Sequence, residues 1–167
     1  TAVHGYDDAE HPVLRLRFAQ MLYSAKDYRD AISQLNIAIS LKSDFANAYY
    51  NLGLVCGHLG QFKEAVEYLK RALILNPAPA DTYFSLGDAY AALGEYAKAK
   101  ENIQQALAID SNFIEAYYKL GILLAVQKDY DGAKKNLKQV LEKDPKSIKT
   151  YYQLGLVCAE SGDDGEA

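Results

Sequence analysis

The sequence lacks tryptophan altogether and contains only two cysteines, four prolines and eleven glycines among its 167 residues. Prolines and glycines are too few for a chain dominated by linkers. The residues are 50% hydrophobic and 24% charged, as in a globular protein rather than a disordered one. No apolar run reaches the ~18 residues that a membrane-spanning helix requires. Membrane insertion is therefore not expected.

An excess of positive charge is also missing. The 22 acidic and 18 basic residues give a formal net charge of −4 and an isoelectric point near 5.4. Binding to phosphates requires clustered lysine and arginine, so nucleic acid is not expected as a partner. The densest basic stretch, Lys134 to Lys149, is interrupted by Glu142 and Asp144. Mixed charge of this kind is typical of a solvated helix face.

The sequence carries none of the short motifs that mark a catalytic or cofactor site. HExxH, CxxC, a phosphate-binding GxxxxGK[ST] loop and a GxSxG elbow are all absent. The three histidines, His4, His11 and His58, stand apart from any metal-ligating pattern. We therefore expect no metal, no cofactor and no catalytic residue in this chain.

What the sequence does have is fourteen tyrosines, most of which recur with a period of 34 residues. Shifting the sequence by that period aligns residues 49–62, 83–96, 117–130 and 151–164 without insertion or deletion. The period predicts four complete units and a partial fifth, and residues 1–11 do not match it and are predicted to be an N-terminal extension. The predicted units are 12–45, 46–79, 80–113, 114–147 and 148–167.

Each unit contains two stretches with apolar residues at helical spacing. In the second unit the predicted helices are Ala46 to Leu59 and Phe62 to Leu75, with the second ended by Asn76-Pro77. Glycine suits the turn between them because it tolerates unusual backbone angles. Gly60 and Gly94 occupy this turn, and Lys26 and Lys128 replace glycine there in the first and fourth units.

Small residues recur at two positions where the paired helices are expected to approach closely. The first helices carry Ala19, Gly53, Gly87, Gly121 and Gly155, and the second helices carry Ala31, Ala65, Ala99, Ala133 and Ala167. The two cysteines, Cys56 and Cys158, lie at equivalent positions three units apart. Neighbouring helices are ~8–10 Å apart, so cysteines three units apart exceed the ~7 Å Cα separation that a disulfide allows. A disulfide between Cys56 and Cys158 is therefore excluded, and both are predicted to be buried.

The repeating residues of the third unit are Tyr83, Leu86-Gly87, Tyr90, Ala99, Ile103 and Ala106. In this pattern the chain resembles the tetratricopeptide repeat family over residues 12–167. It departs from the family in having tyrosine for the usual tryptophan, Ser111 for the usual proline, and Arg15 and Phe18-Ala19 in the first unit. The resemblance implies an all-α, right-handed superhelical solenoid of antiparallel helix-turn-helix hairpins. It also implies a non-catalytic scaffold that mediates protein–protein interaction.

In this family the first helices line a concave groove, and a few outward-facing positions contact the ligand. Near the end of the first helices, Ala91, Ala125 and Ala159 leave room. The groove positions carried over to this sequence are Leu16, Arg17, Gln20, Tyr50, Asn51, Leu54, Asp81, Phe84, Ser85, Asp88, Glu115, Tyr118, Lys119, Ile122, Lys149, Tyr152, Gln153 and Leu156. Four of these positions form an aromatic row, Tyr50, Phe84, Tyr118 and Tyr152. This row either offers a stacking surface to a peptide or packs against neighbouring units.

Some members of the family clamp a peptide's C-terminal carboxylate with lysine, asparagine and arginine from three successive first helices. Asn51 and Lys119 fit that pattern, but the remaining positions do not supply it; they hold Leu54, Asp81, Phe84 and Ser85. A carboxylate clamp is therefore not expected. Because Asp81, Asp88 and Glu115 lie in the middle of the groove, the predicted partner is a protein or peptide segment that is apolar with some basic character.

Two other functions remain compatible with the sequence. The array could assemble with copies of itself through its ends or its convex face, giving a homo-oligomer. It could instead be the recruitment domain of an enzyme whose catalytic part lies outside this chain. Residues 148–167 could cap the array, but Gly165-Glu166-Ala167 resembles the start of a second helix and favours a piece of a longer protein. The unpaired cysteines and the lack of a visible export signal favour the cytoplasm.

Overall fold

The computed structural model describes residues 11–77 and 79–162, and within them it consists of nine α-helices and no strand. The predicted extension (apart from His11) and Ala167 lie outside these described residues. The first helices of the hairpins are α1 (Pro12–Ser24), α3 (Ala46–His58), α5 (Ala80–Ala92), α7 (Ile114–Val126) and α9 (Ile148–Ser161). The second helices are α2 (Tyr28–Leu41), α4 (Phe62–Leu75), α6 (Tyr96–Ile109) and α8 (Tyr130–Lys143).

The helix ends follow the 34-residue period rather than the prolines. The helices α4 and α8 stop at Leu75 and Lys143, just before Asn76-Pro77 and Asp144-Pro145. The helices α2 and α6 are equally long, 14 residues, although no proline follows them. The predicted first helix of the second unit is one residue too long, because Leu59 is the C-cap of α3. Proline is therefore compatible with the end of these helices but does not determine it.

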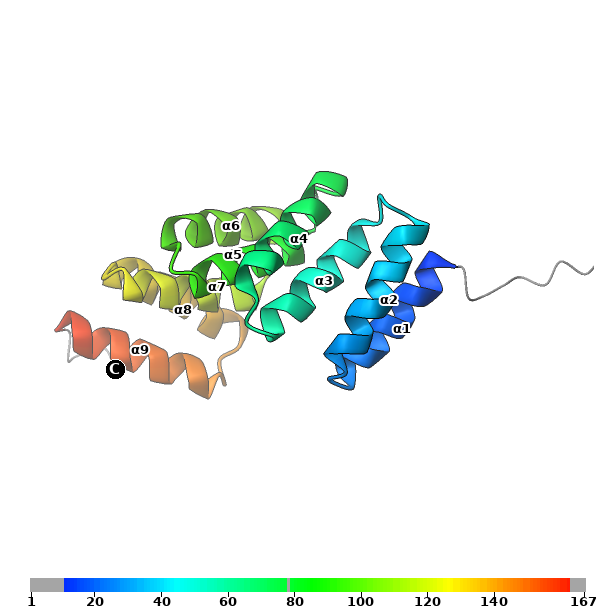
Figure 1. Ribbon diagram of the computed structural model, residues 1–167. Helices are drawn as coiled ribbons and strands as arrows, with labels where there is room; N and C mark the ends of the chain where they lie inside the picture. Colours follow the sequence, from blue (N-terminus) through cyan, green and yellow to red (C-terminus); the bar gives the residue numbers. More distant parts are fainter. Residues whose placement is uncertain (1–10, 78, 163–167) are drawn as a thin grey trace, which may run out of the picture.

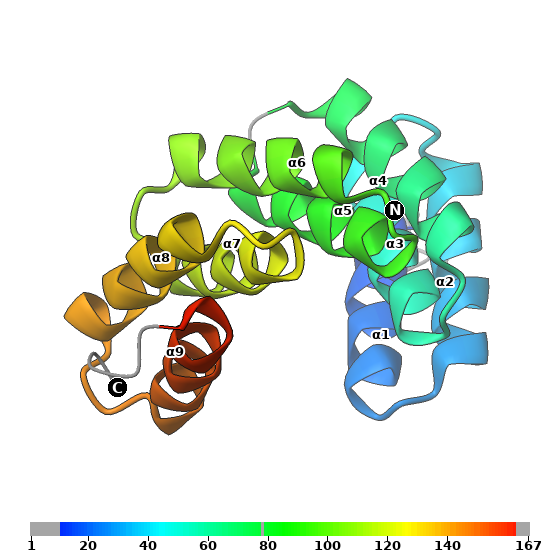
Figure 2. The same ribbon diagram turned by 90° about the vertical axis from the view of Figure 1, so that its left-hand side faces the viewer.

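The four complete hairpins, α1–α2 to α7–α8, stack side by side along the chain, so that α1 and α9 lie at opposite ends (Figure 1). Turned by 90°, the array forms an arch with the second helices along its outer side (Figure 2). The helices α3, α5, α7 and α9 lie on its inner side (Figure 2). No helix in the described part of the chain is both long and apolar enough to cross a membrane.

Small residues hold the two helices of each hairpin together, as the sequence predicts. The alanines Ala31, Ala65, Ala99 and Ala133 are fully buried. A Cβ atom added at Gly53, Gly87 or Gly121 would lie only 2.5, 2.7 or 2.9 Å from a side-chain carbon of the second helix. The side chains concerned are Leu69, Ile103 and Leu137. An added Cβ at Gly155 would meet nothing within 4 Å.

One left-handed residue follows the first helix of each of the five units, always at the same position of the repeat. Gly60, Gly94 and Gly162 have φ of 74°, 76° and 80°, and Lys26 and Lys128 have φ of 65° and 63°. An L-residue with a side chain loses about 1–2 kcal/mol in this conformation, whereas glycine does not. The two lysines therefore keep the turn geometry at the expense of stability.

Replacing Lys128 by glycine is expected to stabilise the protein by about 1 kcal/mol, because the left-handed strain disappears. The midpoint of urea unfolding, followed by circular dichroism, measures this. Lys135→Gly is the matched control, since it removes an exposed lysine from the helical backbone of α8 and should destabilise by about 1 kcal/mol. A loss of stability in Lys128→Gly would contradict the strain explanation.

The basic stretch on α8 is exposed with one exception. Lys135, Lys138 and Lys143 are exposed. Lys134, however, is only 7% exposed. The prediction of a solvated face is therefore wrong at Lys134, because this residue follows directly after the buried Ala133 on the side of α8 that packs inward.

Candidate functional site

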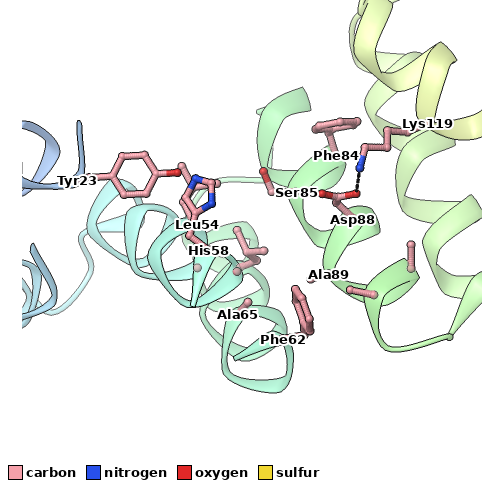
Figure 3. Close-up of a pocket in the computed structure, with 15 residues that line it drawn as sticks. Tyr23, Leu54, His58, Phe62, Ala65, Phe84, Ser85, Asp88, Ala89 and Lys119 are labelled. Atoms are coloured by element: carbon pink, nitrogen blue, oxygen red, sulfur yellow. Dashed lines mark hydrogen bonds and ion pairs between the residues drawn. The ribbon is translucent and has the colours of Figure 1, made fainter. Parts of the chain in front are cut away.

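A pocket of about 540 Å³ lies among the helices that line the inner side of the arch. It extends from α1 across α3 and α5 to Lys119 of α7, with α4 forming its floor (Figure 3). The pocket brings together five of the predicted groove residues. These are Leu54, Phe84, Ser85, Asp88 and Lys119.

An ion pair connects neighbouring first helices at one side of this pocket. Lys119 Nζ on α7 donates to Asp88 Oδ1 on α5 at 2.6 Å (Figure 3). The two side chains remain 43% and 47% exposed, so the pair contributes no more than about 1 kcal/mol to stability. Its main effect is on charge, because Lys119 neutralises the carboxylate that the sequence places in the middle of the groove.

The predicted aromatic row serves packing in the middle of the array and is open at its end. Tyr50, Phe84 and Tyr118 are half-buried and pack against the core. The ring of Phe84 lies 4.9 Å from that of Phe113, and Lys149 Nζ lies 4.7 Å from the ring centre of Tyr118. Only Tyr152, 66% exposed, presents most of its ring to solvent.

Tyr50 connects the second and third hairpins through its hydroxyl. Burial raises the pKa of Tyr50, a hydrogen bond with Ser85 partly offsets that rise, and the negative charge of Asp81 adds to it. The hydroxyl therefore stays protonated at neutral pH.

One of the predicted groove residues, Leu16, is too buried to contact a ligand in the groove. Leu16 is only 6% exposed and belongs to the core of the first hairpin, so its assignment to the groove is wrong. The equivalent Tyr50 and Phe84 are instead half-buried and pack against the edge of the core. Leu54 and Ile122 are half-buried, and Leu156 is 42% exposed.

The remaining predicted residues lie around smaller hollows or on the open face. Arg17 and Gln20 line a shallow hollow of about 380 Å³ on α1. Ile122, Gln153 and Leu156 line another of about 260 Å³ between α7 and α9. The amide of Asn51 donates to the backbone carbonyl of Asn47. The charged residues Asp81, Glu115 and Lys149 are exposed.

Several pocket residues escape sequence reasoning because their positions vary from unit to unit. Tyr23, Gly57 and His58 line the pocket. The ring of His58 lies 5.2 Å from Tyr23 and 5.8 Å from Tyr28, so it packs between the first two hairpins. Nothing in the 34-residue period indicates this cluster, since the residue equivalent to His58 is Ala92 in the next unit.

Both cysteines are buried and free, as predicted. Burial, aided by the negative charge of Glu64, raises the pKa of the Cys56 thiol, which disfavours the reactive thiolate. Among the described residues, no group of three or more histidine, cysteine, aspartate or glutamate side chains could hold a metal ion.

Structures of known proteins resemble this array over nearly its whole length. YrrB, described as a TPR protein with an unusual peptide-binding site, superposes with a TM-score of 0.81 and 26% identity over 95% of this chain and 82% of its own. MamA superposes with a TM-score of 0.85 and 23% identity over 95% and 86%. PilW, a type IV pilus biogenesis factor, gives 0.86 and 20% over 93% and 73%. The last two show the fold alone.

Sequence comparison agrees with the structural likeness. No curated protein matches the sequence significantly. Profiles described as tetratricopeptide repeat match residues 44–112 and 92–154, and one described as TPR repeat matches residues 19–57. Together these matches extend from the first hairpin into α9. The chain belongs to the tetratricopeptide repeat family.

Proposed function

We propose that this protein is a non-catalytic scaffold that binds a protein or peptide segment in its concave groove. The observation that carries the proposal is the pocket of about 540 Å³ on the inner side of the arch, to which α1, α3, α4, α5 and α7 all contribute. Ligand sites commonly have volumes of about 300–1,000 Å³. The peptide-binding site described for YrrB, a structure of similar fold, supports the same assignment.

The chemistry of the groove favours an apolar segment with some basic character. Leu54 and Phe84 give the pocket apolar walls. Lys119 pairs with Asp88, so the pocket itself carries little net charge. The exposed carboxylates of Asp81 and Glu115 lie in the first turns of α5 and α7, where they can attract basic residues that flank the apolar part of the partner.

A peptide array tests this specificity. Peptides rich in leucine, phenylalanine and lysine are expected to bind, and peptides with acidic tails are expected not to bind. Asp81→Lys should weaken the binding of the lysine-containing peptides about two- to fivefold, the range of an exposed charge pair, and less at high salt.

Asp131→Lys is the control for this variant, because Asp131 is also an exposed aspartate in the first turn of a helix, here α8 on the outer side. It should leave the affinity unchanged. A preference for acidic tails would contradict the proposed partner chemistry.

One observation favours self-association as a second candidate function. Leu14, Phe18 and Met21 are 40%, 47% and 69% exposed on α1 and share one helix face. At the equivalent positions of α3, the side chains of Ala48, Leu52 and Val55 are at most 1% exposed, because they pack on the preceding hairpin. A second copy of the chain could cover the apolar face of α1 in the same way.

A further inference from the structure

The packing of the array does not explain Gly57 of α3. The glycines Gly53, Gly87 and Gly121 have a structural reason, since an added Cβ would collide with the second helix. Gly132 lies against the carboxylate of Asp129, which caps α8. An added Cβ at Gly57 would meet nothing within 4 Å, and its φ is not positive. Alanine would favour the helix more, so stability alone does not select glycine here.

The missing side chain of Gly57 leaves space in the pocket. Gly57 lines it next to Leu54 and His58. The equivalent residue of α1 is Tyr23, whose ring extends toward His58 at 5.2 Å. A side chain of that kind at Gly57 would occupy the pocket, whereas glycine leaves it open.

The walls around this space are mainly apolar. Phe62 and Ala65 of α4 and Ala89 of α5 all line it (Figure 3). Leu69, only 1% exposed, closes the floor. The ion pair between Asp88 and Lys119 adjoins the pocket and has no net charge. An uncharged, apolar group therefore suits the pocket better than a charged one, which would lose its hydration without gaining a counter-charge.

We propose that this pocket anchors one bulky apolar side chain, a phenylalanine or a leucine, of the bound segment, and that Gly57 keeps the space open. The inference rests on the proposed peptide-binding function and specifies its main contact. A few well-buried anchor residues commonly supply most of the affinity of an interface. The ion pair offers one donor, Lys119, and one acceptor, Asp88, to the peptide backbone on either side of the anchor.

The probe is a fluorescein-labelled peptide that is selected from a displayed library of random short peptides on the wild-type chain. Its affinity is measured by fluorescence anisotropy. In an alanine scan of this peptide, replacing one phenylalanine or leucine should weaken binding about tenfold or more. Gly57→Leu should weaken the binding of the parent peptide by a similar factor. The alanine-substituted peptide should bind wild type and Gly57→Leu equally, because its anchor is already gone.

Two further variants separate filling of the pocket from damage to the fold. Ala92→Leu narrows the pocket from α5, where Ala92 is exposed, and should also weaken binding of the parent peptide. Ala108→Leu adds the same bulk to an exposed position of α6 on the outer side and should have no effect. Gly57→Ala should raise the melting temperature by about 1–4 °C, since alanine favours the helix.

The possible outcomes distinguish this inference from the function on which it rests. Failure of the library to yield any peptide that binds would contradict the proposed function. Selected peptides that bind wild type, Gly57→Leu and Ala92→Leu equally, yet respond to Asp81→Lys, would leave groove binding intact and overturn the anchor pocket. Tenfold losses in both pocket variants, with none in Ala108→Leu, would support it.

Discussion

Gly87→Leu is expected to destabilise the array by about 1–3 kcal/mol or more, because leucine does not fit between α5 and α6. A Cβ at this position would lie 2.7 Å from Cγ1 of Ile103 and 3.0 Å from the carbonyl oxygen of Ala99. The carbonyl belongs to the backbone of α6 and cannot rotate away, so the two helices must separate. Urea unfolding followed by circular dichroism measures the loss.

The chain provides a matched control for this substitution. Gly57→Leu makes the same change in a first helix, but its Cβ meets nothing within 4 Å. It should not destabilise the array, because leucine also favours the helix more than glycine does. Equal losses in the two variants would contradict close packing of α5 against α6 as the cause of the loss in Gly87→Leu. Ile103→Ala in the Gly87→Leu background should recover part of the loss, because the two side chains compete for one space.

Leu137→Ala is expected to lower the free energy of unfolding by about 2–5 kcal/mol. The upper end of this range exceeds the loss expected for Gly87→Leu. Leu137 of α8 is fully buried and lies against Gly121 of α7. Truncation there removes buried apolar surface and leaves a cavity that the rigid hairpin cannot close. The free energy of unfolding from urea titration is the measurement.

The control for Leu137→Ala is Leu41→Ala, which removes the same atoms from the last residue of α2. Leu41 is 42% exposed, so its truncation should cost less than about 1 kcal/mol. Similar losses at the two positions would contradict a core organised around Leu137.

The hairpins could be predicted from the sequence because their determinants are local and recur. Five turn positions share one left-handed conformation, whether glycine or lysine occupies them. Gly53, Gly87 and Gly121 each face one large aliphatic residue of the paired helix. A period of 34 residues without insertion fixes which side chains meet inside a hairpin, so helix limits and core residues follow from spacing alone.

The groove could be predicted only in part because it depends on how side chains differ between equivalent positions. Leu16 packs into the core, whereas the equivalent Tyr152 is largely exposed. The ion pair of Asp88 and Lys119 joins residues that are 31 positions apart. This separation is shorter than the 34-residue period by about one helical turn. That offset could have indicated the pair in advance. The pocket at Gly57 had no such signal, because an empty space results from the whole surroundings rather than from any one repeat.

The stacking of hairpins along one axis has a mechanical consequence. The main contacts of each helix are with its hairpin partner and with helices of the adjacent hairpins; the arch is therefore not closed by contacts between its ends (Figure 2). The radius of such an arch follows from small rotations that add up from hairpin to hairpin. A bound segment that contacts α3, α5 and α7 would fix the spacing of these helices and with it the rotations between their hairpins. Binding in the middle of the array would thus change the distance between α1 and α9 at its two ends.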